Sequence, residues 1–286
     1  MSKRIKAYSD IFIKYLFGSE GNEDILLDFI NDVLGVSGFT KITKLKILNP
    51  FKILEFQGDK ESILDVEVMD ENGKYYNVEI QSTGNEIYKH RPLYYWAKTY
   101  KSQLGEFDSY KKLKPVITIN ILNFVLIKES QDYHNWFFLA KNNDIELVLS
   151  DHLYIHFLEM PKLPEKFTNI SDNLVRWLYF LRDADKEDKD MKIIIGNDDK
   201  LKKAKDVYDR FNQSKVLRSL YDKQLEARKT YITDIEQAKE EGLEEGLKEG
   251  KEEGLKKTAK NLKKMGLDID KIMEATGLSK KEIEEL

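Results

Sequence analysis

The sequence predicts an α/β protein whose mixed central sheet is flanked by helices and followed by an α-helical C-terminal extension. Residues 41–81 alternate between apolar and polar side chains with the period of half-buried strands. Residues 115–127 are almost wholly apolar, which is typical of a strand buried on both faces in the middle of a sheet. After residue 164 the pattern changes to charged amphipathic helices without a convincing strand. We therefore expect a sheet-containing core and a helical remainder.

The individual elements follow from the same patterns. Two helices should begin the chain, over residues 9–17 and 22–34, with Asn22 as an N-cap and Gly35 as a stop signal. Another helix is expected over residues 86–104. The expected strands are residues 41–47, 53–57, 62–70, 74–81, 115–127, 145–150 and 153–160.

Three domains are expected from the changes in pattern. Residues 1–164 should form the α/β core, and residues 165–236 a helical extension packed on it. Residues 237–286 should form a glycine-periodic acidic linker with a small helical tail.

The composition limits what kind of protein this is. The chain has 286 residues, a formal net charge of -4 and no cysteine. Any binding to nucleic acid would therefore have to depend on a local positive surface, and disulfides and thiolate metal sites are excluded. No apolar run approaches the ~20 residues that cross a bilayer, and the N-terminus does not resemble a signal peptide. These features predict a cytoplasmic protein with no membrane association.

The strands at residues 62–70 and 74–81 form a predicted hairpin. Its register follows from which positions, odd-numbered or even-numbered, carry the apolar side chains of each strand. Each strand has one apolar face, and both faces meet the core only if odd positions pair with odd positions. A two-residue Asn72-Gly73 turn breaks this parity. A three-residue loop restores it by pairing Asp70 with Lys74, with Gly73 in the left-handed bulge position. We predict that loop.

This register brings Asp65 opposite Glu79 on the polar side of the hairpin. Two carboxylates with β-carbons ~5 Å apart repel each other as anions unless a cation lies between them or one is protonated. A hard divalent ion such as Mg²⁺ (or Mn²⁺) would satisfy both. The alternative is that Asp65, Glu67 and Glu79 form the solvated face of an edge hairpin, with lysines nearby to soften the repulsion.

The hairpin places Asp65 on one strand, a turn after it, and the sequence Glu79-Ile80-Gln81 on the next strand. This order resembles the PD-(D/E)XK nuclease superfamily, in which a restriction-endonuclease-like core hydrolyses DNA. More narrowly, the chain resembles the recombination-promoting nuclease (Rpn) and transposase family within it. The matching segments are DIFIKYLFG, LDVEVMDENGKYYNVEIQ, HRPLYYWAKTYKSQL and LKPVITINIL, which lie in order within roughly residues 8–160. The resemblance implies a PD-(D/E)XK nuclease-like core and a Mg²⁺-dependent DNA endonuclease that hydrolyses phosphodiester bonds and promotes DNA recombination.

The same resemblance implies roles for individual residues. Asp65, Glu79 and the backbone carbonyl of Ile80 would bind the metal, and Gln81 would occupy the third catalytic position. Lysine is the commonest residue at that position, and a neutral Gln81 can only orient a water and donate a hydrogen bond. Slow chemistry, or none, is therefore expected.

Three further residues are candidates for accessory roles. Asp10 and Lys14 lie one helical turn apart and could be a surface ion pair. In the resembled family this segment packs near the active site, so that Asp10 could contact a water at the metal and Lys14 a phosphate. Arg91 could bind the scissile phosphate in a bidentate manner. Tyr95 and Trp96, in the same predicted helix, are expected to be structural.

The four histidines do not form a recognised zinc-binding pattern. They lie at positions 90, 134, 152 and 156, and His152 and His156 share a probable strand in which they are too far apart to chelate one ion. No small-molecule cofactor is expected.

The C-terminal tail repeats glycine every four residues, at positions 242, 246, 250 and 254. Each glycine costs about 1 kcal/mol relative to alanine in an isolated helix, so this segment should fray, serve as a spacer, or become ordered in a homo-oligomer. The last residues predict two or three short helices with turns at Gly266 and Gly277.

Three functions remain open from the sequence. The first is an active metal-dependent endonuclease, and the second is a nuclease-fold protein that binds DNA with weak or no cleavage because of Gln81. The third is an oligomeric interaction protein that acts through its C-terminal tail.

Overall fold

The computed structural model describes residues 4–52, 66–167, 171–186 and 189–286. The chain folds into two compact units, Met1–Tyr221 and Asp222–Leu286. The helices of the N-terminal unit are α1 (Asp10–Gly18), α2 (Glu23–Val36), α3 (His90–Ser102), α4 (Asn173–Asp183), α5 (Lys189–Ile195) and α6 (Asp199–Gln213), with single 3₁₀ turns at Glu86–Lys89, Tyr110–Lys112 and Met160–Lys162. Helix α7 (Lys215–Lys264) begins in this unit, and α8 (Ile269–Thr276) and α9 (Lys280–Glu285) follow it.

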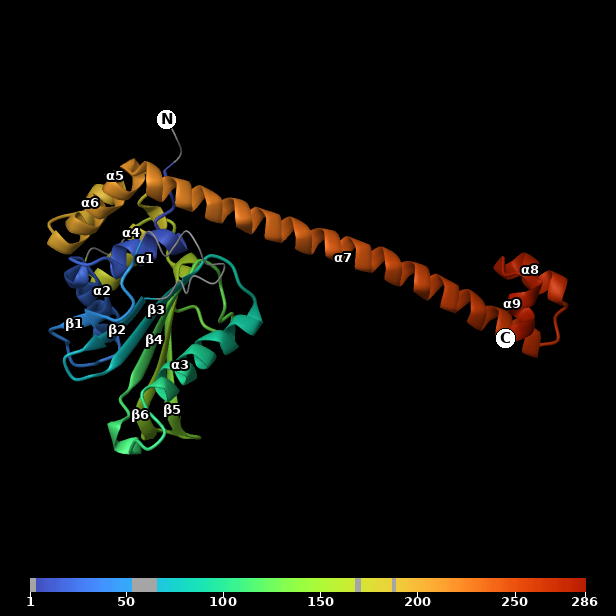
Figure 1. Cartoon of the computed structure of the whole chain (residues 1–286), viewed down its shortest axis with the longest axis horizontal. Helices are drawn as coiled ribbons and strands as arrows, with labels where there is room; N and C mark the ends of the chain where they lie inside the picture. Colours follow the sequence, from blue (N-terminus) through green and yellow to red (C-terminus); the bar gives the residue numbers. More distant parts are fainter. Residues whose placement is uncertain (1–3, 53–65, 168–170, 187–188) are drawn as a thin grey trace. The chain divides into compact units, whose positions relative to one another are not determined.

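A six-stranded mixed sheet forms the centre of the N-terminal unit (Figure 1). Its strands are β1 (Leu45–Ile47), β2 (Val66–Asp70), β3 (Tyr75–Gln81), β4 (Val116–Leu122), β5 (His134–Lys141) and β6 (Asp144–Glu159), in the order β1-β2-β3-β4-β6-β5. Strands β3, β4 and β6 run parallel, and the outer strands pair antiparallel. The predicted α/β class with a mixed, helix-flanked sheet is confirmed.

Strand β4 lies in the middle of the sheet, as its unbroken apolar sequence predicts. Every residue from Val116 to Leu122 is buried, and β4 is hydrogen-bonded to β3 on one side and to β6 on the other. Helices cover both faces, so neither face of this strand meets water, which explains why its sequence lacks alternation.

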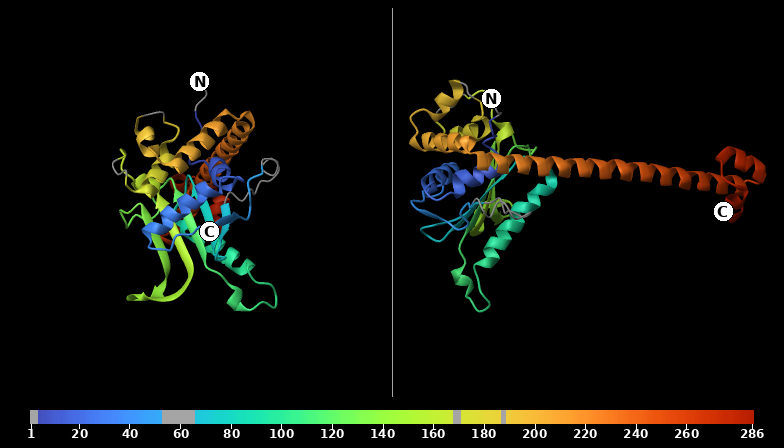
Figure 2. Two further views of the ribbon diagram at one scale, coloured as in Figure 1. Left: turned by 90° about the vertical axis from the view of Figure 1, so that its left-hand side faces the viewer. Right: turned by 45° about the horizontal axis from the view of Figure 1, so that its top comes forward.

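Two separate hydrophobic clusters cover the two faces of the sheet. The larger one joins α1, α2, α4 and α6 to the sheet through aromatic side chains such as Phe12, Phe29 and Trp177. The smaller one joins Tyr88 and the α3 residue Trp96 to the ends of β4 and β6. Helix α3 and the pair α1 and α2 therefore lie on opposite sides of the strands (Figure 2).

The hairpin between β2 and β3 has the predicted three-residue loop. Val66 pairs with Val78, which is the register that parity requires. The NH of Asp70 donates to the carbonyl of Lys74 over 3.0 Å, and Gly73 has a φ of 79°. A side chain with a β-carbon is disfavoured at that angle, so glycine permits the loop.

The buried carboxylate of Asp70 fixes the start of this loop. Its Oδ1 accepts hydrogen bonds from the backbone NH groups of Asn72 and Lys74, at 2.8 and 2.9 Å, and its Oδ2 accepts one from the Tyr76 hydroxyl at 3.0 Å. These bonds satisfy the NH groups that the turn leaves unpaired.

The edge of the sheet beyond β4 differs from the prediction. Two short strands were expected at residues 145–150 and 153–160, whereas β6 is one continuous strand of 16 residues. Strand β5 was not predicted. It pairs with β6 through a hairpin in which Asn143 has a φ of 63°. The expected strand at residues 53–57 lies outside the described residues.

Helices α4 and α6 share the larger core with α1 and α2, and α5 packs on α4. The division between the two compact units falls between Tyr221 and Asp222. Helices α4, α5 and α6 lie in the part of the chain after residue 164 for which amphipathic helices are predicted.

The glycine-periodic segment is helical, contrary to the expected fraying. Helix α7 continues through Gly242, Gly246, Gly250 and Gly254 as part of 50 residues. The residues between the glycines are mostly Leu, Glu and Lys, which have high helix propensity. In the C-terminal unit Ile272 and Ile283 pack against Ala259 at the end of α7, and Gly277 ends α8 with a φ of 71°. Among the described residues, no helix has the length and apolarity to cross a bilayer.

Candidate active site

Glu79 lies at the centre of the candidate site, on the face of β3 that α3 covers. Its neighbours on that face are Asn77 on the same strand and Asn120 on β4, which pairs directly with Glu79. All three side chains are buried, and Glu79 is only 2% exposed. The alternative of a solvated face on an edge hairpin is therefore wrong for β3, because β4 and α3 enclose it.

The Glu79 carboxylate has one basic partner in the described structure. The Nη2 of Arg91, in the first turn of α3, lies 2.6 Å from Glu79 Oε1. The side-chain amide of Gln81, two residues along β3, donates to the same oxygen over 3.0 Å. The Arg91 side chain is 41% exposed and stacks 5.3 Å from the ring of Tyr95. The buried carboxylate of Glu79 is thus paired with the guanidinium of Arg91, which is itself partly exposed to solvent.

Burial raises the pKa of Glu79, because a carboxylate loses its hydration inside the protein. The charge of Arg91 opposes this effect most strongly, and the hydrogen bond from Gln81 and the polar hydroxyl of Tyr88 oppose it further. The negative charge of Asp10 raises the pKa again, which places Asp10 of α1 within electrostatic reach of Glu79. The ionised form of Glu79 therefore needs positive charge nearby.

Two polar residues near Glu79 were not predicted as site residues. The hydroxyl of Tyr88 donates to Oδ1 of Asn120 over 3.3 Å, and Nδ2 of Asn120 donates to the carbonyl of His156 over 3.0 Å. These bonds hold Asn120 in place beside Glu79. The available signal was an asparagine in the middle of the apolar run VITINIL, where a polar side chain requires hydrogen-bond partners.

The structure places the other predicted residues as follows. Gln81 ends β3 and contacts Glu79, and Ile80 is buried next to it with its side chain in the larger core. Asp10 and Lys14 are half-buried in α1, which packs against β2 and β3. Asp65 lies outside the described residues. No group of three or more His, Asp or Glu suited to a metal occurs in the part of the chain that is described, which leaves out Asp65.

The residues around Glu79 suit a hard divalent cation. Such ions prefer carboxylate and carbonyl oxygens, and Glu79 offers a carboxylate whose burial leaves its charge poorly hydrated. A cation there would favour the ionised form in the way that Arg91 does.

A pair of neighbouring histidines, one buried and one half-buried, lies on the other side of the sheet. The Nε2 of His134 on β5 is 3.0 Å from Nδ1 of His156 on β6, and Trp136 stacks on His156 with ring centroids 6.1 Å apart. Burial lowers the pKa of His134 to about 4 and that of His156 to about 3. The two histidines are brought together by the hydrogen bonding of β5 to β6, which was not predicted.

The free energy of unfolding should fall as the pH decreases from about 6.5 towards about 4. Both histidines bind protons more weakly in the folded chain than in the unfolded chain, so protonation favours unfolding in this window. The loss should be on the order of 3 kcal/mol for each of the two histidines. Urea denaturation at several pH values measures it. In the double variant His134→Gln, His156→Gln the free energy of unfolding should depend less steeply on pH. The control variant His90→Gln, which changes an exposed histidine, should keep the pH dependence of the wild type. An unchanged slope in the double variant would contradict the interpretation.

Comparison with known proteins supports the nuclease interpretation. A family model described as PD-(D/E)XK nuclease family transposase matches residues 7–242, which include the sheet, the Glu79 site and the first half of α7. Comparisons with curated proteins and with solved structures gave no match. The match covers most of the chain, including the mixed sheet in which β3 carries the buried Glu79 close to Gln81. We conclude that the chain belongs to the PD-(D/E)XK nuclease family of transposases.

Proposed function

We propose that this protein is a divalent-metal-dependent DNA endonuclease that hydrolyses phosphodiester bonds and acts in DNA recombination. The family supplies the nuclease class. The observation that carries the proposal is Glu79, a carboxylate that is 2% exposed and paired with a half-exposed Arg91. An ionised acid buried on a central strand is costly for stability, and such groups are characteristic of functional sites.

Glu79, Asp65 and the backbone carbonyl of Ile80 are the proposed ligands for Mg²⁺ or Mn²⁺. When bound, the ion supplies Lewis-acid stabilisation of the negative charge that develops on the phosphate. Gln81 donates a hydrogen bond from its side-chain amide to the Glu79 carboxylate and so helps to hold that ligand in place.

Arg91 is the proposed phosphate-binding residue. Its guanidinium forms a planar set of donors that suits a phosphate, and its partial exposure lets a DNA strand reach it. In the absence of DNA the same group balances the charge of Glu79. Asp10 and Lys14 are proposed to support the site from α1, where the charge of Asp10 acts on Glu79.

Replacement of Glu79 by glutamine should abolish cleavage. The neutral amide keeps the shape of the side chain but removes the anionic ligand, so nicking of supercoiled plasmid with Mg²⁺ should decrease at least 100-fold, as removal of a main catalytic group does elsewhere. Asp65→Asn should have the same effect. Agarose gels of plasmid incubated with each purified variant measure the rate.

The matched control for this experiment is Glu67→Gln, which removes a carboxylate from the neighbouring strand. Glu67 contacts Thr99 of α3 rather than Glu79, so this variant should retain activity within threefold of the wild type. Thermal melting confirms that each variant is folded. Equal nicking by the Glu79→Gln variant and the wild type would refute the proposed site.

The second function, DNA binding with weak cleavage, is favoured by one observation. The third motif position is a neutral Gln81 whose amide is already hydrogen-bonded to Glu79. It adds no positive charge to the site.

Replacement of Gln81 by lysine should therefore accelerate plasmid nicking, by about tenfold, because an ammonium group stabilises the developing phosphate charge better than an amide. The variant Gln237→Lys adds the same charge at an exposed position of α7 and should leave the rate unchanged. If Gln81→Lys cleaves no faster than the wild type while both bind a DNA duplex equally, the neutral amide does not limit the reaction.

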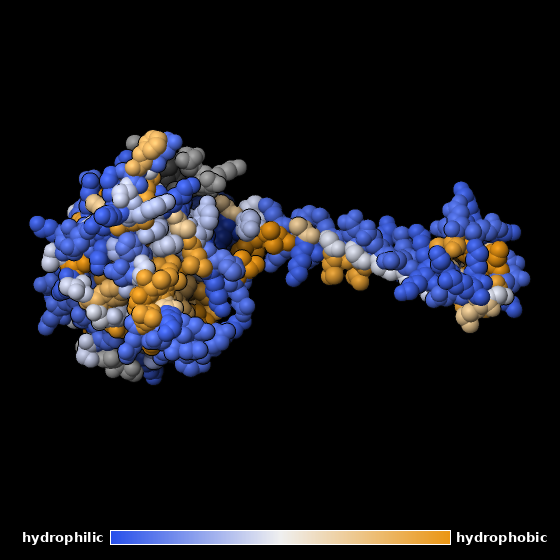
Figure 3. Space-filling view, turned by 90° about the horizontal axis from the view of Figure 1, so that it is seen from below, coloured by the Kyte–Doolittle hydropathy of each residue, from blue (hydrophilic) through white to orange (hydrophobic). Residues whose placement is uncertain are grey.

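We also propose a homo-oligomer formed through the C-terminal tail. The exposed apolar side chains of α7 recur along the helix, and Figure 3 shows hydrophobic side chains at intervals among hydrophilic ones. Leu243 and Leu247 are 63% and 66% exposed in the single chain. A second copy would bury them, and the intervening glycines would permit close approach of two helices.

Light scattering should give a mass above that of one chain for the full-length protein. The double variant Leu243→Glu, Leu247→Glu should shift the mass towards that of a monomer, because it places charge in the contact. Lys248→Glu, which alters charge without removing an apolar side chain, is the control. A monomeric wild-type protein at micromolar concentration would refute this proposal.

A further inference from the structure

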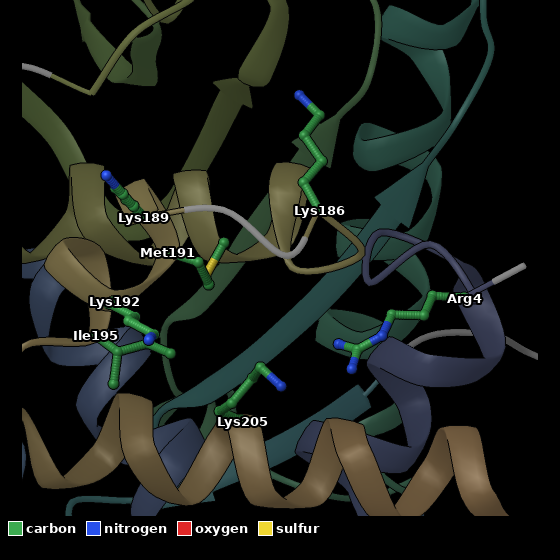
Figure 4. A pocket seen from close by; sticks show the side chains of 7 residues that line it. All are labelled: Arg4, Lys186, Lys189, Met191, Lys192, Ile195 and Lys205. Atoms are coloured by element: carbon green, nitrogen blue, oxygen red, sulfur yellow. The ribbon is translucent and has the colours of Figure 1, made fainter.

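A cavity of about 450 Å³ in the N-terminal unit is lined mainly by basic side chains (Figure 4). They come from segments far apart in the sequence, namely the N-terminal segment before α1, the turn after α4, α5, and α6. The basic residues are Arg4, Lys186, Lys189, Lys192 and Lys205. None of the residues of the candidate active site lines this cavity.

The lining also has an apolar part. Met191 and Ile195 of α5 face the cavity between the basic residues. Met191 is 4% exposed and belongs to the larger core, so this side of the cavity is firmly held. Arg4 and Lys205 point towards one another across the space in Figure 4. The cavity therefore combines a cationic rim with an apolar wall.

Among the described residues that line this cavity, all the charged ones are basic. Asp209 serves two of the basic residues, lying 3.6 Å from Arg4 and 2.5 Å from Lys205. Lys186 lies 2.7 Å from Asp183.

Lys189 and Lys192 form no ion pair with any residue of the described ranges. Within the described ranges, the five cationic side chains of the lining have ion pairs with two carboxylates, those of Asp209 and Asp183, so positive charge predominates among the described lining residues. Asp190 of α5 does not line the cavity. Such an excess within a concave space attracts anions, because neighbouring cations repel one another until an anion neutralises them.

We propose that this cavity is a second ligand site that binds a small phosphate-bearing anion of nucleotide size. Phosphate groups suit several convergent lysines and an arginine, and the volume lies within the range of ligand pockets. The apolar wall of Met191 and Ile195 offers contact for a sugar or base attached to the phosphate. The site is separate from the proposed nuclease centre and does not depend on it.

The concave form favours a small ligand over the backbone of duplex DNA. Double-stranded DNA contacts cations that protrude from a surface, whereas Arg4 and Lys205 are 33% and 22% exposed and face inwards. The exposed lysines of α5 are nevertheless accessible to both kinds of ligand. Both a small phosphate-bearing anion and duplex DNA would bind through phosphate groups. The experiment below distinguishes these two kinds of ligand.

Isothermal titration of the full-length chain with ATP, and separately with inorganic tripolyphosphate, tests the proposal. EDTA is included so that no divalent cation links the ligand to the Glu79 site. At least one of the two probes should bind with a stoichiometry of one, and its affinity should decrease as salt increases. The double variant Lys189→Glu, Lys192→Glu should weaken binding at least tenfold. Both positions are exposed, so the fold should be retained, and thermal melting checks this.

The matched control is Lys248→Glu, Lys251→Glu, which makes the same change of net charge on α7 and should alter the affinity less than twofold. The variant Glu79→Gln should bind the probes as the wild type does, so that failure of the proposed nuclease function leaves this test intact. Tighter binding of ATP than of tripolyphosphate indicates a nucleotide, and equal binding indicates the phosphate chain alone.

Several outcomes would overturn the proposal. They are the absence of binding by both probes, equal affinities in the Lys189→Glu, Lys192→Glu variant and the wild type, or loss of binding in Glu79→Gln. Binding of a DNA duplex that depends on Lys189 and Lys192, without binding of either small probe, would assign the surface to DNA instead.

Discussion

The arrangement of the core depends on the register of the hairpin between β2 and β3, which pairs even-numbered positions with even-numbered ones. Both strands present one apolar face, and both faces can reach the larger core only if the loop has three residues. Gly73, with a φ of 79°, permits that loop, and Asp70 binds its NH groups. A shift by one residue would turn the apolar face of one of the two strands away from the core, either that of Val66 or that of Val78, and in the second case Glu79 would change faces as well. The position of the candidate site therefore follows from a turn.

Burial then determines the chemistry at Glu79. Because β3 lies inside the sheet and α3 covers it, the carboxylate is removed from water, and its negative charge requires a partner. Arg91 provides one from the first turn of α3, and Gln81 provides a neutral hydrogen bond. An arrangement in which one arginine balances an acid, while remaining half-exposed, is suited to exchange between the acid and an anionic substrate.

The two sites proposed for the N-terminal unit differ in character. The Glu79 site is acidic and lies on the side of the sheet that α3 covers, whereas the cavity at Arg4 and Lys205 is basic and lies among helices α4 to α6. The acidic site suits metal ions, and the basic one suits phosphates. The overall charge of -4 reveals neither, because opposite charges are segregated locally.

The sequence by itself determined the features that depend on neighbouring residues. Alternation fixed the faces of β2 and β3, Gly73 fixed their loop, and the apolar run fixed β4 at the centre. It could not determine β5, whose pairing with β6 depends on a partner strand, nor the burial of the polar face of β3. The ion pair of Arg91 with Glu79, the support of Asn120 by Tyr88, and the basic cavity all join residues distant in the chain. Such contacts depend on how helices and strands pack, so only the tertiary structure decided them.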